Sequence, residues 1–127
     1  MFEISAEYSF AAGHALRGYK GKCEHVHGHN YKVQVTVAGE NLDAVGLLID
    51  FAELRSALQA VTEPFDHRML NDLPPFDQVN PSAENMAKYF CEALEPRVGA
   101  KGVQVQAVRV WETETNSATY RPATSPR

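Results

Sequence analysis

Apolar and polar residues alternate along two stretches of the N-terminal half of the chain. Apolar side chains occupy the even positions from Phe2 to Phe10 and the odd positions from Tyr31 to Val37. Such alternation places one face of a strand against a core and the other toward solvent. Extended backwards, the second pattern puts His27 and His29 on the face of the valines. The sequence therefore predicts two half-buried strands, with His14 just after the first.

Two stretches in the middle of the chain have helical spacing instead. Apolar residues recur at intervals of three and four from Phe51 to Val61 and from Ala83 to Leu94. Asp50 and Ser82 precede these stretches as expected for N-cap residues. Pro96 is expected to help end the second helix.

The last third of the chain alternates in two phases. Apolar residues stand at odd positions up to Val105 and at even positions from Val108, so a β-bulge near Ala107 is predicted. Glu112 falls in the second phase, and a short strand is expected around Tyr120. Two strands, two helices and two strands in this order favour an α+β fold with an antiparallel sheet.

Composition narrows the class of protein further. The 127 residues suffice for one domain, expected over residues 1–121 with a flexible tail at 122–127. The apolar and charged fractions of 44% and 22% are those of ordinary globular proteins. No apolar run is long enough for a membrane span, which predicts a cytoplasmic protein without membrane association. A net charge of −4 argues against a general nucleic-acid-binding surface.

Histidines in the segment CEHVHGH, Cys23 to His29, carry the most specific chemical signal. On a strand, His27 and His29 project to one face and can bind one ion. With His14 as a third imidazole they would form a tetrahedral Zn²⁺ site with one open position, the arrangement of catalytic zinc. His25 has the same phase and remains a competing ligand, and histidines without any metal are the alternative.

Three further residues have side chains suited to acid–base chemistry. Cys23 lies four residues before His27, where a nearby cation would favour the thiolate as a base or nucleophile, although a small core residue is the alternative. Asp66 and His67 are adjacent and could form a proton-transfer pair. Cys91 lies on the second predicted helix, where packing is the better interpretation.

Glu112 shares a strand face with Val108 and Val110, so its carboxylate is predicted to point into an apolar environment and to need partners there. A guanidine-like edge of a ligand would satisfy it with two hydrogen bonds. The alternative is a surface glutamate at the end of a strand.

Six motifs occur together and in a fixed order: FAAGHAL, CEHVHGHNY, GLLIDFAELR, FDHRMLND, NPSAEN and VWETE. In these motifs the chain resembles the 6-pyruvoyltetrahydropterin synthase and 6-carboxytetrahydropterin synthase family, most of all its carboxytetrahydropterin branch. The resemblance implies the T-fold, an α+β fold in which two hairpins and two helices on one face of the sheet assemble into barrels. It also implies a homo-oligomer, a trimer or a hexamer, with active sites at subunit interfaces.

The resemblance assigns a role to each candidate residue. The zinc ligands would be His14, His27 and His29, the catalytic triad Cys23, Asp66 and His67, and the pterin contacts Glu112 and Ser82. In this family the aspartate and histidine of the triad come from a neighbouring subunit. Ala83 replaces a second threonine of some members, which makes the substrate contact at Ser82 less secure.

The implied activity is that of a zinc-dependent lyase. It would convert 7,8-dihydroneopterin triphosphate to 6-carboxy-5,6,7,8-tetrahydropterin, acetaldehyde and triphosphate, a step of queuosine-type deazapurine synthesis, without an external reductant. The spacing from Cys23 to His27 favours this branch over the pyruvoyl branch. Arg17, Lys20 and Lys22 could hold the triphosphate, with solvated loop charges as the alternative.

Two other interpretations remain open. Glu24, a further predicted substrate-binding residue, resembles the glutamate of relatives that release 6-hydroxymethyl-7,8-dihydropterin for folate synthesis, so a folate-branch or dual-activity enzyme is an alternative. The second is a pterin-binding module with a structural zinc. A fourth protein ligand that closes the zinc shell would favour it.

Overall fold

The computed structural model describes residues 1–18 and 25–123. Its strands form one sheet in the order β3-β1-β2-β4-β5. They are β1 (Phe2–His14), β2 (His27–Gly39), β3 (Arg68–Met69), β4 (Gln104–Trp111) and β5 (Ser117–Tyr120). Neighbouring strands pair antiparallel except β1 and β3, which pair parallel over two residues. The predicted α+β fold is confirmed, and β3 is an addition that the sequence pattern did not show.

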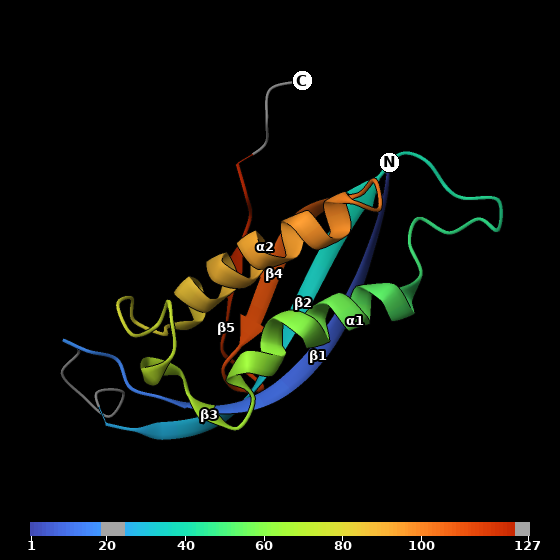
Figure 1. The fold of residues 1–127 in the computed structure, drawn as a ribbon. Coiled ribbons are helices and arrows are strands. Elements are labelled where there is room, and N and C mark those ends of the chain that lie inside the picture. The colour runs from blue at the N-terminus through green and yellow to red at the C-terminus, as the bar shows by residue number, and fades with distance from the viewer. Residues whose placement is uncertain (19–24, 124–127) are drawn as a thin grey trace.

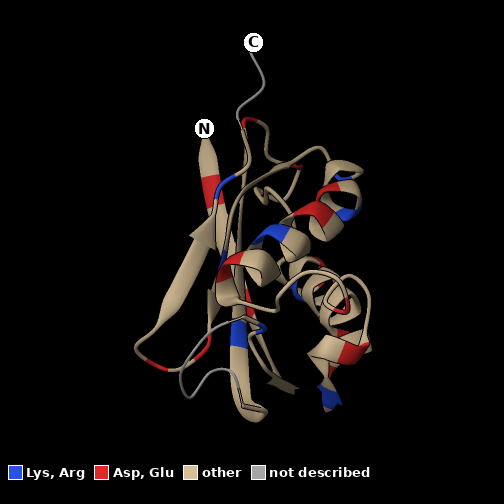
Figure 2. Cartoon of the chain, turned by 90° about the vertical axis from the view of Figure 1, so that its left-hand side faces the viewer, with Lys and Arg blue, Asp and Glu red and all other residues tan. Residues whose placement is uncertain are grey.

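Two helices cover one face of the sheet, as Figure 1 shows and Figure 2 shows from the side. They are α1 (Phe51–Thr62) and α2 (Ala83–Gly99). Two 3₁₀ turns, η2 (Glu63–Phe65) and η3 (Leu70–Asp72), flank β3 between them. Among the residues described, no helix is both long enough and apolar enough to cross a membrane.

The first strand is longer than its alternation predicts. β1 pairs with β2 along its whole length, from Phe2 opposite Gly39 to His14 opposite His27. The strand therefore continues to His14, past the predicted alternation that stops at Phe10. The small residues at the end of β1 show no alternation of apolar and polar side chains in the sequence. Their extended conformation is fixed by pairing with β2.

Both predicted N-caps are present. Asp50 Oδ1 accepts a hydrogen bond from the N–H of Ala52 at 2.8 Å, and Ser82 Oγ accepts one from the N–H of Asn85 at 3.1 Å. The prediction that Pro96 helps to end α2 is wrong, since the helix continues to Gly99. Pro96 is exposed and lies in the last turns, so its ring removes a single helical hydrogen bond while buried neighbours hold the helix against the sheet.

The predicted bulge in β4 is also present. Thr36 pairs with Ala107 and Val37 with Val105, which leaves Gln106 as the extra residue. The bulge returns Val108 and Val110 to the core face, where both are fully buried. Glu112 follows in the same phase.

The core lies between the sheet and the two helices. Its helix side includes the predicted stripe of α2, which is buried at every position: Ala83, Met86, Ala87, Phe90 and Leu94. Cys91 is buried in the same layer, with Sγ 3.8 Å from Glu95 Oε1. Burial, with a smaller contribution from Glu95, raises the pKa of Cys91 to about 12. The packing interpretation of Cys91 is thus confirmed.

Candidate metal centre

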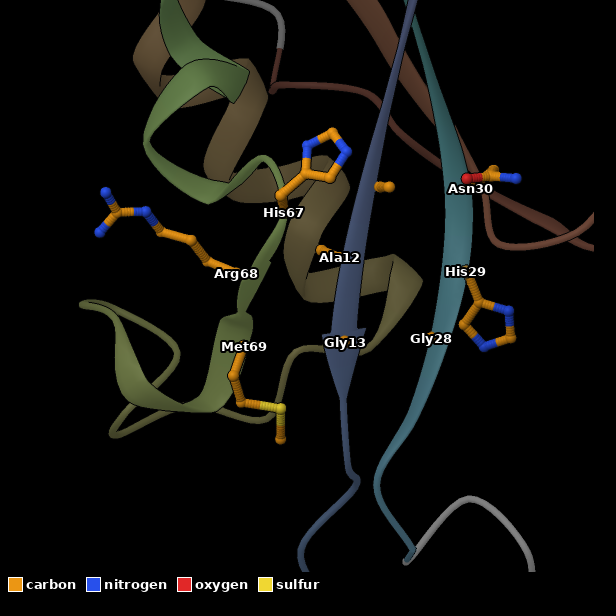
Figure 3. Close-up of a pocket in the computed structure, with 9 residues that line it drawn as sticks. Ala12, Gly13, Gly28, His29, Asn30, His67, Arg68 and Met69 are labelled. Atoms are coloured by element: carbon orange, nitrogen blue, oxygen red, sulfur yellow. The ribbon is translucent and has the colours of Figure 1, made fainter.

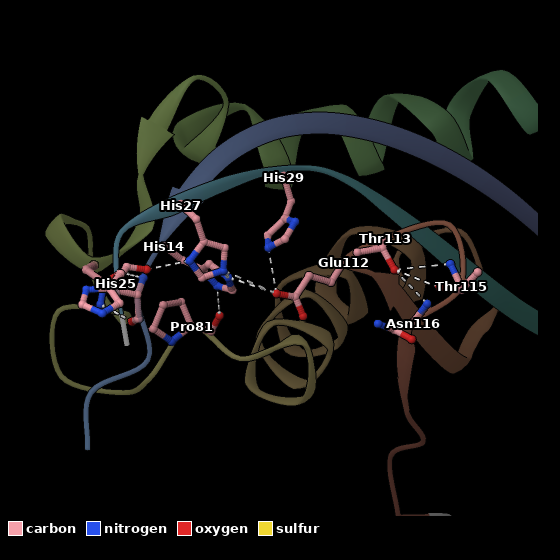
Figure 4. A network of polar contacts seen from close by, with 11 residues as sticks. His14, His25, His27, His29, Pro81, Glu112, Thr113, Thr115 and Asn116 are labelled. Carbon is pink, nitrogen blue, oxygen red and sulfur yellow. Dashed lines mark hydrogen bonds and ion pairs between the residues drawn. The ribbon is translucent and has the colours of Figure 1, made fainter. Parts of the chain in front are cut away.

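Three histidines and a glutamate converge on the helix side of the sheet, near the end of β1 (Figure 4). His14 is the last residue of β1, His27 and His29 are at the start of β2, and Glu112 follows β4. One potential ligand atom from each lies within 4.8 Å of the others. The alternation of β2 therefore places His27 and His29 as the sequence predicts.

The contacts within this cluster are short. His14 Nε2 is 3.0 Å from His27 Nε2. Glu112 Oε1 is 2.9 Å from His29 Nε2, 3.1 Å from His14 Nε2 and 4.0 Å from His27 Nε2. The His14 side chain is only 1% exposed, whereas those of the other three residues are 19–29% exposed. The cluster is therefore anchored in the core and accessible from one side.

Hydrogen bonds to backbone carbonyls fix two of the imidazoles. His14 Nδ1 donates to the carbonyl of Pro81 at 2.8 Å, and His27 Nδ1 donates to that of His25 at 2.6 Å. A carbonyl only accepts, so in a neutral ring the proton is on Nδ1 and the lone pair on Nε2. Two lone pairs then face each other across 3.0 Å, beside a carboxylate oxygen. Such a set of acceptors is stabilised by a cation among them, and this hydrogen bonding of Nδ1 is typical of metal-binding histidines.

Two buried polar atoms at the cluster have no hydrogen-bond partner among the described residues, His29 Nε2 and Tyr31 Oη. Glu112 Oε1 is close to His29 Nε2, yet the pair is not aligned as a hydrogen bond. Burial, only partly offset by Glu112, lowers the pKa of His29 and favours the neutral, metal-binding ring. Burial and the charge of Glu112 both raise the pKa of Tyr31. A metal ion would satisfy His29 Nε2, so the donor set fits a bound metal.

His25, the competing ligand in the sequence, is not part of this group. Its side chain is exposed, and its contribution to the cluster is the carbonyl that accepts from His27.

Residues of η3 and of the loop between η3 and α2 hold the chain that leaves β1. Asn71 pairs with the backbone of Ala15 through two hydrogen bonds of 2.9 and 2.8 Å. Asn80 pairs in the same way with the backbone of Arg17, at 2.9 Å for both bonds. Together with the Pro81 carbonyl, the two amides fix the end of the strand that carries the first histidine. None of the three could be predicted from the sequence, because neither a carbonyl nor an isolated asparagine gives a periodic signal.

Arg17 is not simply a solvated charge in a loop, because its guanidinium binds backbone carbonyls. Its Nη2 donates to the carbonyls of Phe76 and Asn71 at 2.7 and 3.2 Å. Lys20 and Lys22 lie outside the described residues, so the hypothesis of a triphosphate site there stays a prediction.

Asp66 and His67 form a pair on the other side of β1 from β2. Asp66 Oδ1 accepts from the N–H of Ala11 at 3.0 Å and lies 3.0 Å from His67 Nδ1. The N–H of His67 donates to the carbonyl of Ala11 at 2.6 Å, and His67 has a positive φ of 60°. Its side chain is 80% exposed. The backbone therefore holds Asp66 and His67 at the surface, with His67 in a conformation uncommon outside glycine.

A pocket of about 460 Å³ beside His67 extends across β1 to Gly28, His29 and Asn30 of β2 (Figure 3). Gly13 and Gly28 face each other in its floor, and His67 and Met69 line one side. Gly28 lies between two cluster histidines on a strand, so its face of the sheet is opposite to theirs. Within one chain, the structure does not bring His67 to the histidine cluster.

The remaining predicted residues lie near the cluster or outside the described part of the chain. Ser82 caps α2 directly after Pro81, whose carbonyl holds His14. Cys23 and Glu24 lie outside the described residues, so their predicted roles stay predictions.

The family model described as 6-pyruvoyl tetrahydropterin synthase matches residues 3–123. The chain belongs to the 6-pyruvoyl tetrahydropterin synthase family. It is 35% identical to the 6-carboxy-5,6,7,8-tetrahydropterin synthase of Synechocystis sp., with 99% of this chain and 98% of the relative covered. It is 36% identical to the 6-pyruvoyl tetrahydrobiopterin synthase of Homo sapiens, over 94% of this chain and 90% of that protein.

A solved structure of this synthase family has the same fold. The 6-pyruvoyl tetrahydropterin synthase of Caenorhabditis elegans superimposes with a TM-score of 0.85 at 30% sequence identity, over 96% of both chains. The α+β arrangement, with two helices on one face of an open sheet, is thus the T-fold expected from the motifs.

Proposed function

We propose that this synthase-family chain is a zinc-dependent lyase that converts 7,8-dihydroneopterin triphosphate to 6-carboxy-5,6,7,8-tetrahydropterin, acetaldehyde and triphosphate. The observation that carries the proposal is the convergence of three imidazoles, two of which have Nε2 left free by a hydrogen bond at Nδ1. Relatives named 6-carboxy-5,6,7,8-tetrahydropterin synthase, from Haemophilus influenzae and Synechocystis sp., match over nearly the whole chain. Queuosine-type synthesis as the pathway, and the cytoplasm as the location, stay predictions from the sequence.

His14, His27 and His29 would hold the metal. Three imidazole nitrogens with an oxygen ligand suit zinc, which prefers four ligands of this kind. When bound, zinc supplies Lewis-acid polarisation of oxygen ligands and so makes a neighbouring C–H more acidic. The Pro81 carbonyl keeps His14 in the binding tautomer. The metal-binding geometry is thus built into the ends of β1 and β2.

His67 and Cys23 would move protons. Asp66 Oδ1 is fixed by the N–H of Ala11 and in turn holds His67 Nδ1, which leaves His67 Nε2 to exchange protons with substrate. Cys23, four residues before His27, is the proposed base, since a thiol close to a metal-bound substrate loses its proton more readily.

Glu112 and Ser82 would contact the pterin. A carboxylate can accept two parallel hydrogen bonds from the amino and ring N–H groups of a pterin, a recognition typical of planar guanidine-like edges. Ser82 Oγ accepts from the N–H of Asn85, so its hydroxyl proton is available for a ligand.

We further propose a homo-oligomer, a trimer or a hexamer, with sites at subunit interfaces. The separation of the Asp66–His67 pair from the histidine cluster supports it, because one substrate could contact both only if they came from two subunits. The open sheet has β3 and β5 at its edges, which leaves it able to continue into a barrel of several copies.

One relative favours a second candidate activity. The human relative is named for pyruvoyl chemistry and is 36% identical. An enzyme of that kind would release 6-pyruvoyltetrahydropterin from the same substrate. The hydroxymethyl product depends on Glu24, and Glu24→Ala should abolish that product alone.

The deciding experiment incubates zinc-loaded protein with 7,8-dihydroneopterin triphosphate and identifies the pterin products by mass spectrometry. The carboxy product with acetaldehyde is expected, and Cys23→Ala should lose it, whereas the exposed-site control Glu114→Gln should keep it. The pyruvoyl or hydroxymethyl product would replace the main assignment. Binding without turnover by a folded, zinc-loaded sample would support the pterin-binding module instead.

A further inference from the structure

We infer that Glu112 is an exchangeable fourth metal ligand, which binds the ion in the substrate-free protein and leaves it when the pterin arrives. This inference rests on the proposed function, in which the same carboxylate binds the pterin edge. It assigns Glu112 two alternative partners and makes the occupancy of the fourth position depend on substrate.

The geometry of the cluster is that of a four-ligand site. Metal–ligand bonds of 2.0–2.1 Å in a tetrahedron separate neighbouring ligand atoms by roughly 3.3 Å. Glu112 Oε1 is 3.1 Å from His14 Nε2, 2.9 Å from His29 Nε2 and 4.0 Å from His27 Nε2, and the His14–His27 distance is 3.0 Å. These four of the six separations scatter around the tetrahedral value, and all six are within 4.8 Å. The carboxylate oxygen therefore occupies the position of a fourth ligand rather than that of a distant counter-charge.

The electrostatics of the cluster favour the same assignment. His14 and His27 each donate from Nδ1 to a carbonyl, so their Nε2 lone pairs face the carboxylate. His29 Nε2 is near Glu112 Oε1 without hydrogen-bond alignment. Acceptor atoms do not attract one another, and a cation shared among them accounts for their closeness.

The position of Glu112 in the hairpin allows exchange without backbone movement. Its N–H donates to the carbonyl of Asn116 at 3.0 Å, which fixes the backbone at the end of β4. The side chain is 26% exposed and can rotate about three torsions. Two parallel hydrogen bonds to a pterin need both carboxylate oxygens, and Oε1 cannot serve fully in that contact while it binds the metal.

The first test measures zinc affinity without substrate. Metal-free wild type, Glu112→Gln and the control Glu114→Gln are titrated with zinc against a chromophoric chelator. Loss of an outer contact of a metal site lowers affinity about 10–100-fold, so loss of a direct anionic ligand should lower it at least about tenfold in Glu112→Gln. Glu114 is exposed in the same hairpin, and its variant should bind zinc like the wild type.

The second test uses wild-type protein, so it does not depend on the folding of a variant. Co²⁺ replaces zinc, and its visible absorption is recorded before and after addition of 7,8-dihydroneopterin. A change of the absorption bands is expected as the carboxylate leaves. In Co²⁺-loaded Glu112→Gln the spectrum should differ from that of the wild type before any pterin is added.

Several results would overturn the inference, and they differ from those that would overturn the proposed function. Unchanged zinc affinity in folded Glu112→Gln would exclude Glu112 as a ligand, whatever the turnover of the wild type. Lowered affinity with a pterin-insensitive wild-type Co²⁺ spectrum would make Glu112 a permanent ligand and refute the exchange. Absence of turnover, with both metal-binding results as expected, would refute only the lyase.

Discussion

Replacement of Tyr31 by phenylalanine should stabilise the metal-free protein, which is unusual for a change in a core. Tyr31 is fully buried, and its hydroxyl has no hydrogen-bond partner among the described residues. The ring stacks on Phe10 at 5.4 Å and packs edge-on against the imidazoles of His14 and His29 at 5.7 and 5.5 Å. Phenylalanine keeps all of these ring contacts and removes only the oxygen.

The size of the effect follows from the desolvation of the hydroxyl. A buried polar group without a partner costs about 1–3 kcal/mol, so Tyr31→Phe should raise the free energy of unfolding by about 1–2 kcal/mol. For a domain of this size that corresponds to an increase in Tm of about 4–8 °C. Urea unfolding of metal-free protein, at one fixed protein concentration, measures the difference.

Tyr8 provides the matched control. It is half-buried on β1, and its hydroxyl is not among the unpartnered buried atoms, so Tyr8→Phe should change the free energy of unfolding by less than about 0.5 kcal/mol. If Tyr31→Phe instead lowered stability by 1 kcal/mol or more, the hydroxyl would have an acceptor in the metal-free protein. That result would refute the inference that the buried Tyr31 hydroxyl lacks a hydrogen-bond partner.

Three other predictions concern the core and the surface. Phe90→Ala should lower the free energy of unfolding by about 3–5 kcal/mol in urea titrations, because Phe90 is fully buried; a loss below 1 kcal/mol would contradict its place in the core. Cys91, with its pKa raised to about 12, should resist iodoacetamide at pH 8 until the protein unfolds, as peptide mass mapping can follow, and native labelling would contradict its burial. Backbone N–H groups, that of Leu47 most of all, donate to the Asp43 carboxylate and lower its pKa. Asp43 should therefore stabilise the fold above about pH 3.9, and this contribution should be lost as the pH falls through the folded pKa of Asp43. The stability difference from Asp43→Ala should therefore shrink in acid, and a pH-independent difference would refute it.

Much of the fold could be predicted because its signals are local. The two alternating strands and the capped helices depend on residues a few positions apart, and so does the bulge, where the phase change appears in the sequence itself. β3 could not be predicted, because its pairing with β1 joins Ala12 to Arg68 and leaves no pattern in two residues. The continuation of α2 through Pro96 depends on tertiary packing, which outweighs one lost hydrogen bond.

The candidate site, like the fold, has some features that could be predicted from the sequence and others that could not. Imidazoles on alternate strand positions could be placed from spacing alone, and the phase of Glu112 correctly indicated an inward carboxylate. Its approach to the histidines depends on the register of β2 and β4, which the sequence does not give. The Pro81 carbonyl that orients His14 has no sequence signal at all, since every residue carries a carbonyl.

Within a single chain, Asp66 and His67 lie apart from the histidine cluster, so one chain does not form the whole of the proposed active site. They are fixed to the backbone of Ala11, on the side of β1 away from β2, while the histidine cluster faces the helices. If two subunits share each site, inactive His67→Ala and inactive His27→Ala subunits should complement each other. After unfolding and joint refolding of an equal mixture, random assembly pairs an intact cluster with an intact Asp66–His67 pair in about a quarter of the sites, so about a quarter of wild-type turnover should return. Separately refolded variants, mixed afterwards, are the control and should stay inactive. If the jointly refolded mixture is inactive as well, although oligomers of mixed composition form, each site must use both groups from one chain.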